Sequence, residues 1–160
     1  MRIGEVALVG QGGHAKGEFI DAVCDEIVVE NEHLIFGRLQ INSQLVLHLY
    51  GLDHRDGDSN PSWDLVSKKL LGYVVLFDWS SAQSFEDIKT TIDMLISRYP
   101  LPIIVAANLA NSLNALPAAV TDADFNISRK THFKFCNTAK PASVRRVLVT
   151  LIDSVIDKLD

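Results

Sequence analysis

Cysteine, excess basic charge and long apolar segments are all scarce in this sequence of 160 residues. The two cysteines, Cys24 and Cys136, lack the close spacing of zinc ligands, so we expect free thiols in a reducing, cytoplasmic setting. The net charge of −5 argues against binding nucleic acid or a membrane surface through bulk electrostatics. No segment approaches the roughly 18 apolar residues of a membrane-spanning helix, and the first apolar run is too short for a secretory signal.

What the chain does contain is an alternation of short apolar runs and helical periodicities. Runs typical of strands are Glu5–Val9, Leu34–Ile41, Leu45–Tyr50, Tyr73–Trp79, Ile103–Ala107 and Thr131–Phe135. Helical patterns are Phe19–Cys24, Trp63–Leu71, Phe85–Ile96 and Val144–Leu159, and a weaker helical propensity covers Ser112–Asn126. Ser84 is the expected cap of the third helix, and Pro141 lies near the start of the fourth. The pattern predicts one α/β domain over residues 1–160, with three layers and a mostly parallel, six-stranded sheet. Asn42-Ser43 predicts a hairpin turn that makes one strand antiparallel, and the acidic segment Asp25–Glu32 predicts a loop.

A glycine-rich turn follows the first apolar run. Its glycines and lysine are Gly10, Gly12, Gly13 and Lys16. Such a turn can direct several backbone N–H groups at a phosphate, where the following helix adds partial positive charge. The phosphate-binding pattern G-x-x-x-x-G-K-[S/T] is only approached, because Ala15 and Gly17 stand at two of its fixed positions. The segment is therefore either a phosphate-binding loop or a tight strand-to-helix turn without a ligand.

The order of the loops resembles that of the Ras-like small GTPases, and especially the bacterial gliding-motility and conservon types. Besides the glycine-rich turn, the resemblance rests on Leu45–Gly51, Trp63–Asp78 and Ser143–Leu151. It implies the P-loop NTPase, or small G-protein, fold over the whole chain. It also implies a guanine-nucleotide site for GTP or GDP. Its residues would be Gly10, Gly12, Gly13, Lys16, Asn108, Asn111, Thr138, Ala139 and Lys140.

The metal and water contacts of that family are altered in this chain. Gly17 replaces the Ser or Thr whose hydroxyl binds Mg²⁺, and Asp25–Glu32 contains no Ser or Thr. Arg55 stands where the family has the glutamine that orients the attacking water. Arg55 could stabilise phosphate charge, but a polar exposed loop is the simpler interpretation. We therefore expect no bound metal and no catalytic residue.

The base-reading motifs are preserved unevenly. The family pattern N-K-x-D becomes Asn108-Leu-Ala-Asn111, so an amide replaces the carboxylate that accepts two hydrogen bonds from guanine. That exchange lowers the expected GTP affinity by roughly 10²-fold and would suit xanthine better. An alternative interpretation is a strand end followed by a helix capped by Asn111 or Ser112. Thr138-Ala-Lys140 matches the family's S-A-K loop.

These substitutions predict a pseudo-GTPase, which is a regulatory or protein-interaction module with weak or no GTP binding and no efficient hydrolysis. The alternative is an atypical GTP-binding switch that hydrolyses the nucleotide slowly. A protein partner is expected at the switch-equivalent surface, formed by Asn31–Arg38, Asp53–Trp63 and Trp79. The resemblance implies a small α/β regulator of the roadblock type as that partner.

Overall fold

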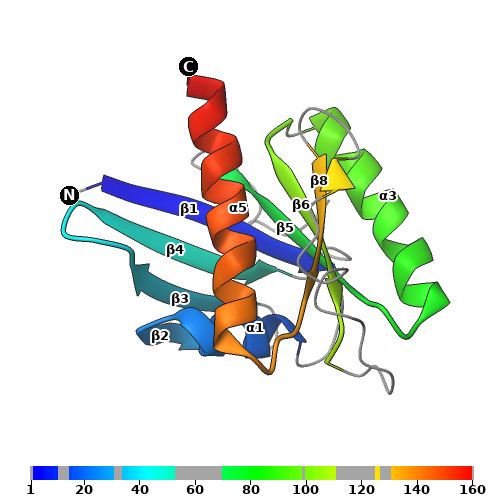
Figure 1. Cartoon of the computed structure of the whole chain (residues 1–160), viewed down its shortest axis with the longest axis horizontal. Helices are drawn as coiled ribbons and strands as arrows, with labels where there is room; N and C mark the ends of the chain where they lie inside the picture. The colour runs from blue at the N-terminus through cyan, green and yellow to red at the C-terminus, as the bar shows by residue number, and fades with distance from the viewer. Residues whose placement is uncertain are drawn as a thin grey trace.

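The computed structural model describes residues 2–10, 15–30, 34–52, 70–98, 100–110, 125–126 and 131–159. These residues form one sheet with helices on both faces (Figure 1). The strands are β1 (Arg2–Gly10), β2 (Glu26–Glu30), β3 (Leu34–Gln40), β4 (Leu45–Leu52), β5 (Leu70–Asp78), β6 (Ile103–Asn108), β7 (Phe125–Asn126) and β8 (Thr131–Cys136). The helices are α1 (Ala15–Val23), α3 (Ala82–Arg98) and α5 (Pro141–Leu159).

The strands lie in the order β2-β3-β4-β1-β5-β6-β8-β7. The five strands β4, β1, β5, β6 and β8 run parallel, whereas β3 is antiparallel to both β2 and β4, and β7 is antiparallel to β8. The mostly parallel sheet and its antiparallel hairpin strand are thus confirmed. The expected number of six strands is wrong, because the described sheet holds seven strands of five residues or more and also the two-residue β7.

Strand β2 accounts for part of that difference. Glu26–Glu30 lies within the segment expected to be an acidic loop, yet it pairs antiparallel with β3. In the sequence, the glutamate at each end of this segment makes the strand pattern of its three apolar residues hard to recognise. Strand β2 forms the edge of the sheet, and Val28 and Val29 are 43% and 37% exposed. An edge strand tolerates such charges because only one side of its backbone is paired and its side chains reach solvent.

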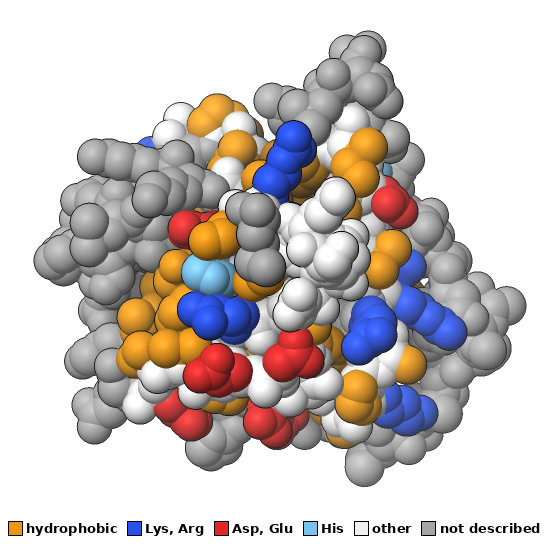
Figure 2. Space-filling view, turned by 90° about the vertical axis from the view of Figure 1, so that its left-hand side faces the viewer, with side chains coloured by type: hydrophobic (Ala, Val, Ile, Leu, Met, Phe, Trp, Pro, Cys, Tyr) orange, Lys and Arg blue, Asp and Glu red, His pale blue; other side chains and the backbone are white. Residues whose placement is uncertain are grey.

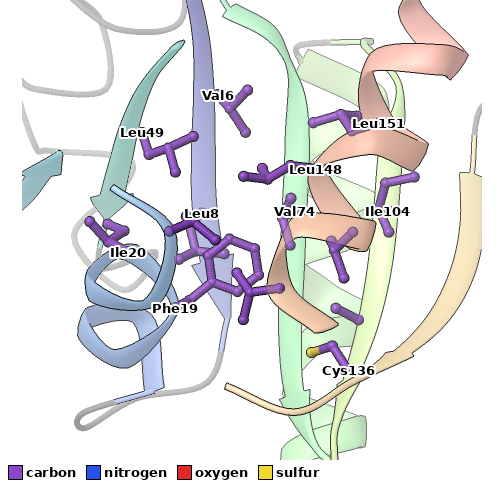
Figure 3. Packing of buried hydrophobic residues seen from close by; sticks show 14 of the residues in the cluster. Val6, Leu8, Phe19, Ile20, Leu49, Val74, Ile104, Cys136, Leu148 and Leu151 are labelled. Carbon is purple, nitrogen blue, oxygen red and sulfur yellow. The ribbon is translucent and has the colours of Figure 1, made fainter. Parts of the chain in front are cut away.

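The core has two layers of side chains, one on each face of the sheet. Along β1, Val6 and Leu8 face the layer under α1 and α5, while Ala7 and Val9 face the layer under α3. Figure 3 shows Phe19 of α1 and Leu148 of α5 pointing into the first layer. The alternation follows from the two-residue period of a strand and confirms the three-layer arrangement.

Local details differ from expectation at the start of two elements. Ser81, rather than Ser84, caps α3, because its Oγ accepts the Ser84 N–H at 3.1 Å. Ser84 lies within the helix, and its own Oγ accepts the Asp78 N–H at 2.8 Å. Leu70 and Leu71 belong to β5 and not to a helix; positions 63–69 of that predicted helix lie outside the described residues.

Two further expectations concern the second half of the chain. Phe125–Asn126 pairs with β8 as a short strand, although helical propensity was predicted to extend to Asn126. Pro141 is the first residue of α5, as expected for a residue that fixes φ and needs no N–H acceptor. None of the helices in the described part of the chain combines the length and apolar character needed to cross a bilayer.

Candidate ligand site at the carboxyl edge of the sheet

Gly10 ends β1 at the edge of the sheet where the parallel strands finish. Its φ is 105°, a left-handed value that residues other than glycine rarely adopt. A Cβ at this position would also collide with the Leu76 carbonyl oxygen of neighbouring β5. Glycine is therefore required here by the strand-to-helix turn itself, whether or not a ligand binds. Gly12 and Gly13 lie outside the described residues.

The first turn of α1 carries the residues that would meet a phosphate and a metal. Ala15 is buried and Lys16 is half-buried in this turn. A Cβ on Gly17 would lie 3.3 Å from Ile35 Cδ1 of β3. The position that the sequence resemblance aligns with a metal-binding hydroxyl thus faces an apolar side chain in this structure.

Asn108 and Thr138 are brought together by the ends of β6 and β8. Both residues are 2% exposed. Asn108 Oδ1 accepts the N–H groups of Thr138, at 3.3 Å, and of Ala110, at 3.1 Å. Asn108 Nδ2 donates to Thr138 Oγ1 at 3.2 Å. The two backbone donors fix the orientation of the amide, because only its oxygen can accept from them.

Glu18 completes this cluster from the opposite side. The Thr138 hydroxyl donates to Glu18 Oε2 at 2.8 Å, which links α1 to the turn before α5 across 120 positions of sequence. A continuous series of donors therefore runs from Asn108 through Thr138 to the carboxylate. We call these three residues the Glu18–Thr138–Asn108 bridge. Sequence reasoning missed Glu18, whose only local signal is an acid in the first turn of a helix, where the dipole favours it.

The remaining groups of the β8–α5 turn also hydrogen-bond within the protein. The Ala139 N–H donates to Asn137 Oδ1 at 2.9 Å, and the Lys140 N–H donates to the Asn137 carbonyl at 2.9 Å. The Asn137 N–H in turn donates to Ser143 Oγ at 2.8 Å. The loop that resembles S-A-K is thus a closed turn in which the Ala139 N–H already has an acceptor.

Other candidate groups have structural roles or low reactivity. Asp78 Oδ1 accepts the N–H and the hydroxyl of Ser80, at 3.0 and 2.6 Å, and so shapes the turn into α3. Burial raises the pKa of Cys136 to about 12, and burial together with Asp25 and Asp21 raises the pKa of Cys24 to about 12. Both thiols are therefore weak nucleophiles at neutral pH. The described residues contain no group of three or more His, Cys, Asp and Glu side chains able to hold a metal ion.

The carboxyl edge therefore brings together part of the predicted set. Gly10, Lys16, Asn108 and Thr138 lie there on β1, α1, β6 and the β8–α5 turn. Arg55 and Asn111 lie outside the described residues, so their predicted roles stay predictions. No protein-family model matches this sequence, and no curated protein is significantly similar to it.

Proposed function

We propose that this chain is a degenerate small GTPase-like module that regulates a protein partner, binds guanine nucleotide weakly or not at all, and lacks efficient hydrolysis. The observation that carries the proposal is the Glu18–Thr138–Asn108 bridge. Ligands of doubly wound sheets bind outside the carboxyl ends of the strands. At that edge, the polar groups that resemble base-reading residues hydrogen-bond to one another.

The surroundings of Gly17 support the absence of efficient hydrolysis. Phosphoryl transfer depends on positioning and on charge stabilisation by a bound metal. Gly17 offers no side-chain oxygen, and its Cβ direction leads to Ile35. A metal held in the manner of the family would lack this ligand, so the phosphates of GTP or GDP would depend on Lys16 and on backbone groups.

Exposed apolar side chains in two parts of the sheet support a role in protein contacts. Val28 and Val29 on β2 and Ile41 after β3 are exposed, and Trp79, which follows β5 at the carboxyl edge, is 44% exposed. Positions 31–33 and 53–63 of the predicted switch-equivalent surface lie outside the described residues. Figure 2 views the side of the molecule that lies at the left of Figure 1 and shows acidic side chains gathered below a group of hydrophobic ones. Exposed apolar groups beside charged ones are typical of surfaces that bind other proteins. We propose a cytoplasmic regulator of the roadblock type as partner, which rests on the sequence resemblance.

A thermal-shift experiment tests the nucleotide part of the proposal. The protein would be heated with millimolar GTP, GDP, ATP or XTP, with and without Mg²⁺, and GTP hydrolysis would be assayed in parallel. A ligand at 100 times its Kd would stabilise the fold by about 2.7 kcal/mol, which is readily seen. We expect little or no shift and no phosphate release.

The Lys16→Ala variant makes the hydrolysis assay specific, and Lys89→Ala is its matched control. Lys89 is an exposed lysine on α3 that pairs with Glu86 at 2.9 Å. Hydrolysis that is lost with Lys16→Ala but kept with Lys89→Ala would contradict the proposal. It would support the alternative, a GTP-binding switch that hydrolyses the nucleotide slowly.

A further inference from the structure

We infer that Glu18, an exposed residue whose carboxylate is bound to Thr138, weakens the binding of phosphate-bearing ligands between α1 and the β8–α5 turn. The inference rests on the proposed function and adds the residue responsible for weak nucleotide binding. Its geometric basis is the 2.8 Å hydrogen bond that Glu18 Oε2 accepts from Thr138 across the carboxyl edge of the sheet.

Thr138 holds the carboxylate in this position. Thr138 is buried, and its hydroxyl accepts a hydrogen bond from Asn108 Nδ2 at 3.2 Å. As a donor, the hydroxyl lies 2.8 Å from Glu18 Oε2 but 3.5 Å from Asn108 Oδ1, so Glu18 is the better acceptor. A hydrogen bond to a carboxylate is also shorter and stronger than one between neutral groups. A ligand that took the place of Glu18 would have to offer Thr138 an equivalent acceptor.

The charge of Glu18 acts against an anion in particular. The N-terminus of a helix attracts phosphate through its free N–H groups and its partial positive charge. Glu18 puts a full negative charge on the first turn of α1 and thereby opposes that attraction. A polyphosphate approaching this helix therefore meets a carboxylate already bound to the opposite side of the site.

A plain alternative is that Glu18 only stabilises the start of α1. In that case its removal would weaken the helix slightly and leave nucleotide affinity unchanged. The two explanations differ in ligand binding and not in stability, so ligand binding is the quantity to measure.

The experiment compares Glu18→Ala with the unaltered chain and with Glu30→Ala, which removes the same charge from another exposed position, on β2. Binding of GDP and GTP with Mg²⁺ would be titrated calorimetrically, after urea unfolding has shown that each variant is folded. We expect Glu18→Ala to bind with a Kd at least about tenfold lower than the other two proteins. Glu18→Gln keeps an acceptor for Thr138 but loses the charge, so it should fall between them.

Equal affinities of Glu18→Ala and Glu30→Ala would overturn the role of Glu18. If Glu18→Ala fails to fold, Glu18→Gln decides the matter, and a Kd equal to that of Glu30→Ala would again overturn the inference. The proposed function fails separately, through Lys16-dependent hydrolysis by the unaltered chain, whatever the ratio between the Glu18 variants.

Discussion

The carboxyl edge of the sheet and its β2 edge are built in opposite ways. At the carboxyl edge, Asn108 and Thr138 are 2% exposed and hydrogen-bond to each other, and Thr138 also donates to Glu18. At the β2 edge, Val28 and Val29 are 43% and 37% exposed and lie between glutamates. The polar side chains at the ends of β6 and β8 thus hydrogen-bond within the protein, whereas the β2 edge presents apolar side chains to solvent.

The largest expected effect comes from breaking the turn that ends β1. Gly10→Ala forces alanine into a φ of 105° and drives its Cβ against the Leu76 carbonyl oxygen, so the loss of unfolding free energy should be about 3 kcal/mol or more. Urea denaturation of the purified variant measures this loss.

Gly17→Ala is the matched control for that variant. Its Cβ would lie 3.3 Å from the flexible end of Ile35, and alanine favours a helix over glycine by about 1 kcal/mol. The unfolding free energy should therefore change by no more than about 1 kcal/mol in either direction. Similar losses in both glycine variants would show that the turn at Gly10 is less constrained than its geometry indicates.

An intermediate loss of unfolding free energy is expected from Asn108→Ala, and Asn42→Ala is its exposed control. Asn108→Ala removes the acceptor of the buried Thr138 N–H and of the half-buried Ala110 N–H, which should cost about 2 kcal/mol. Asn42, in the link between β3 and β4, also accepts two N–H groups, from Gln44 at 2.8 Å and Leu45 at 2.9 Å, but it is exposed. Water can replace it, so Asn42→Ala should cost about 1 kcal/mol or less. Equal losses in urea denaturation would contradict the contrast between the buried cluster and the exposed link.

The same contrast determines what could be predicted from the sequence. The central strands β5 and β6 are buried on both faces, so they appear as near-continuous apolar runs. β6 was predicted to within one residue, whereas β5 begins three residues before its predicted start, within the predicted helix. The edge strand β2 was missed because glutamates at both of its ends are typical of a solvent-exposed loop. Its pairing depends on β3, which lies later in the chain.

Within the candidate site, the tight turn at Gly10 and the strand end at Asn108 were foreseen from glycine and from the end of an apolar run. Glu18 was missed because its partner Thr138 lies 120 positions away, and no local pattern encodes that contact. Ser81 was missed as the cap of α3 because Ser84 lies one turn further on and is followed by acids. Tertiary packing accounts for the first difference, whereas the second is a local choice between two serines three residues apart.

The smallest expected effect is a pH dependence in the β2–β3–β4 part of the sheet. His48 on β4 lies in register with Arg38 of β3 and Glu5 of β1, and its ring packs edge-on against Phe36 at 4.9 Å. Burial lowers the pKa of His48 from 6.5, and Arg38 lowers it further, while Glu5 acts in the opposite direction. The unfolded chain therefore binds a proton at a higher pH than the folded chain does, and the folded state loses stability as the pH falls through this range.

His48→Gln removes the protonation of His48 from the pH dependence of stability and keeps a polar side chain on the strand. The unfolding free energy of the unaltered protein should drop more than that of His48→Gln between about pH 7.5 and pH 5.5. Urea denaturation at both pH values measures the difference. Because the ring is only half-buried, solvent weakens the effect, which should be smaller than the loss from Asn108→Ala. A larger effect would mean that His48 is enclosed as tightly as Thr138, and the contrast between the exposed β2 region and the buried Asn108–Thr138 pair would no longer hold.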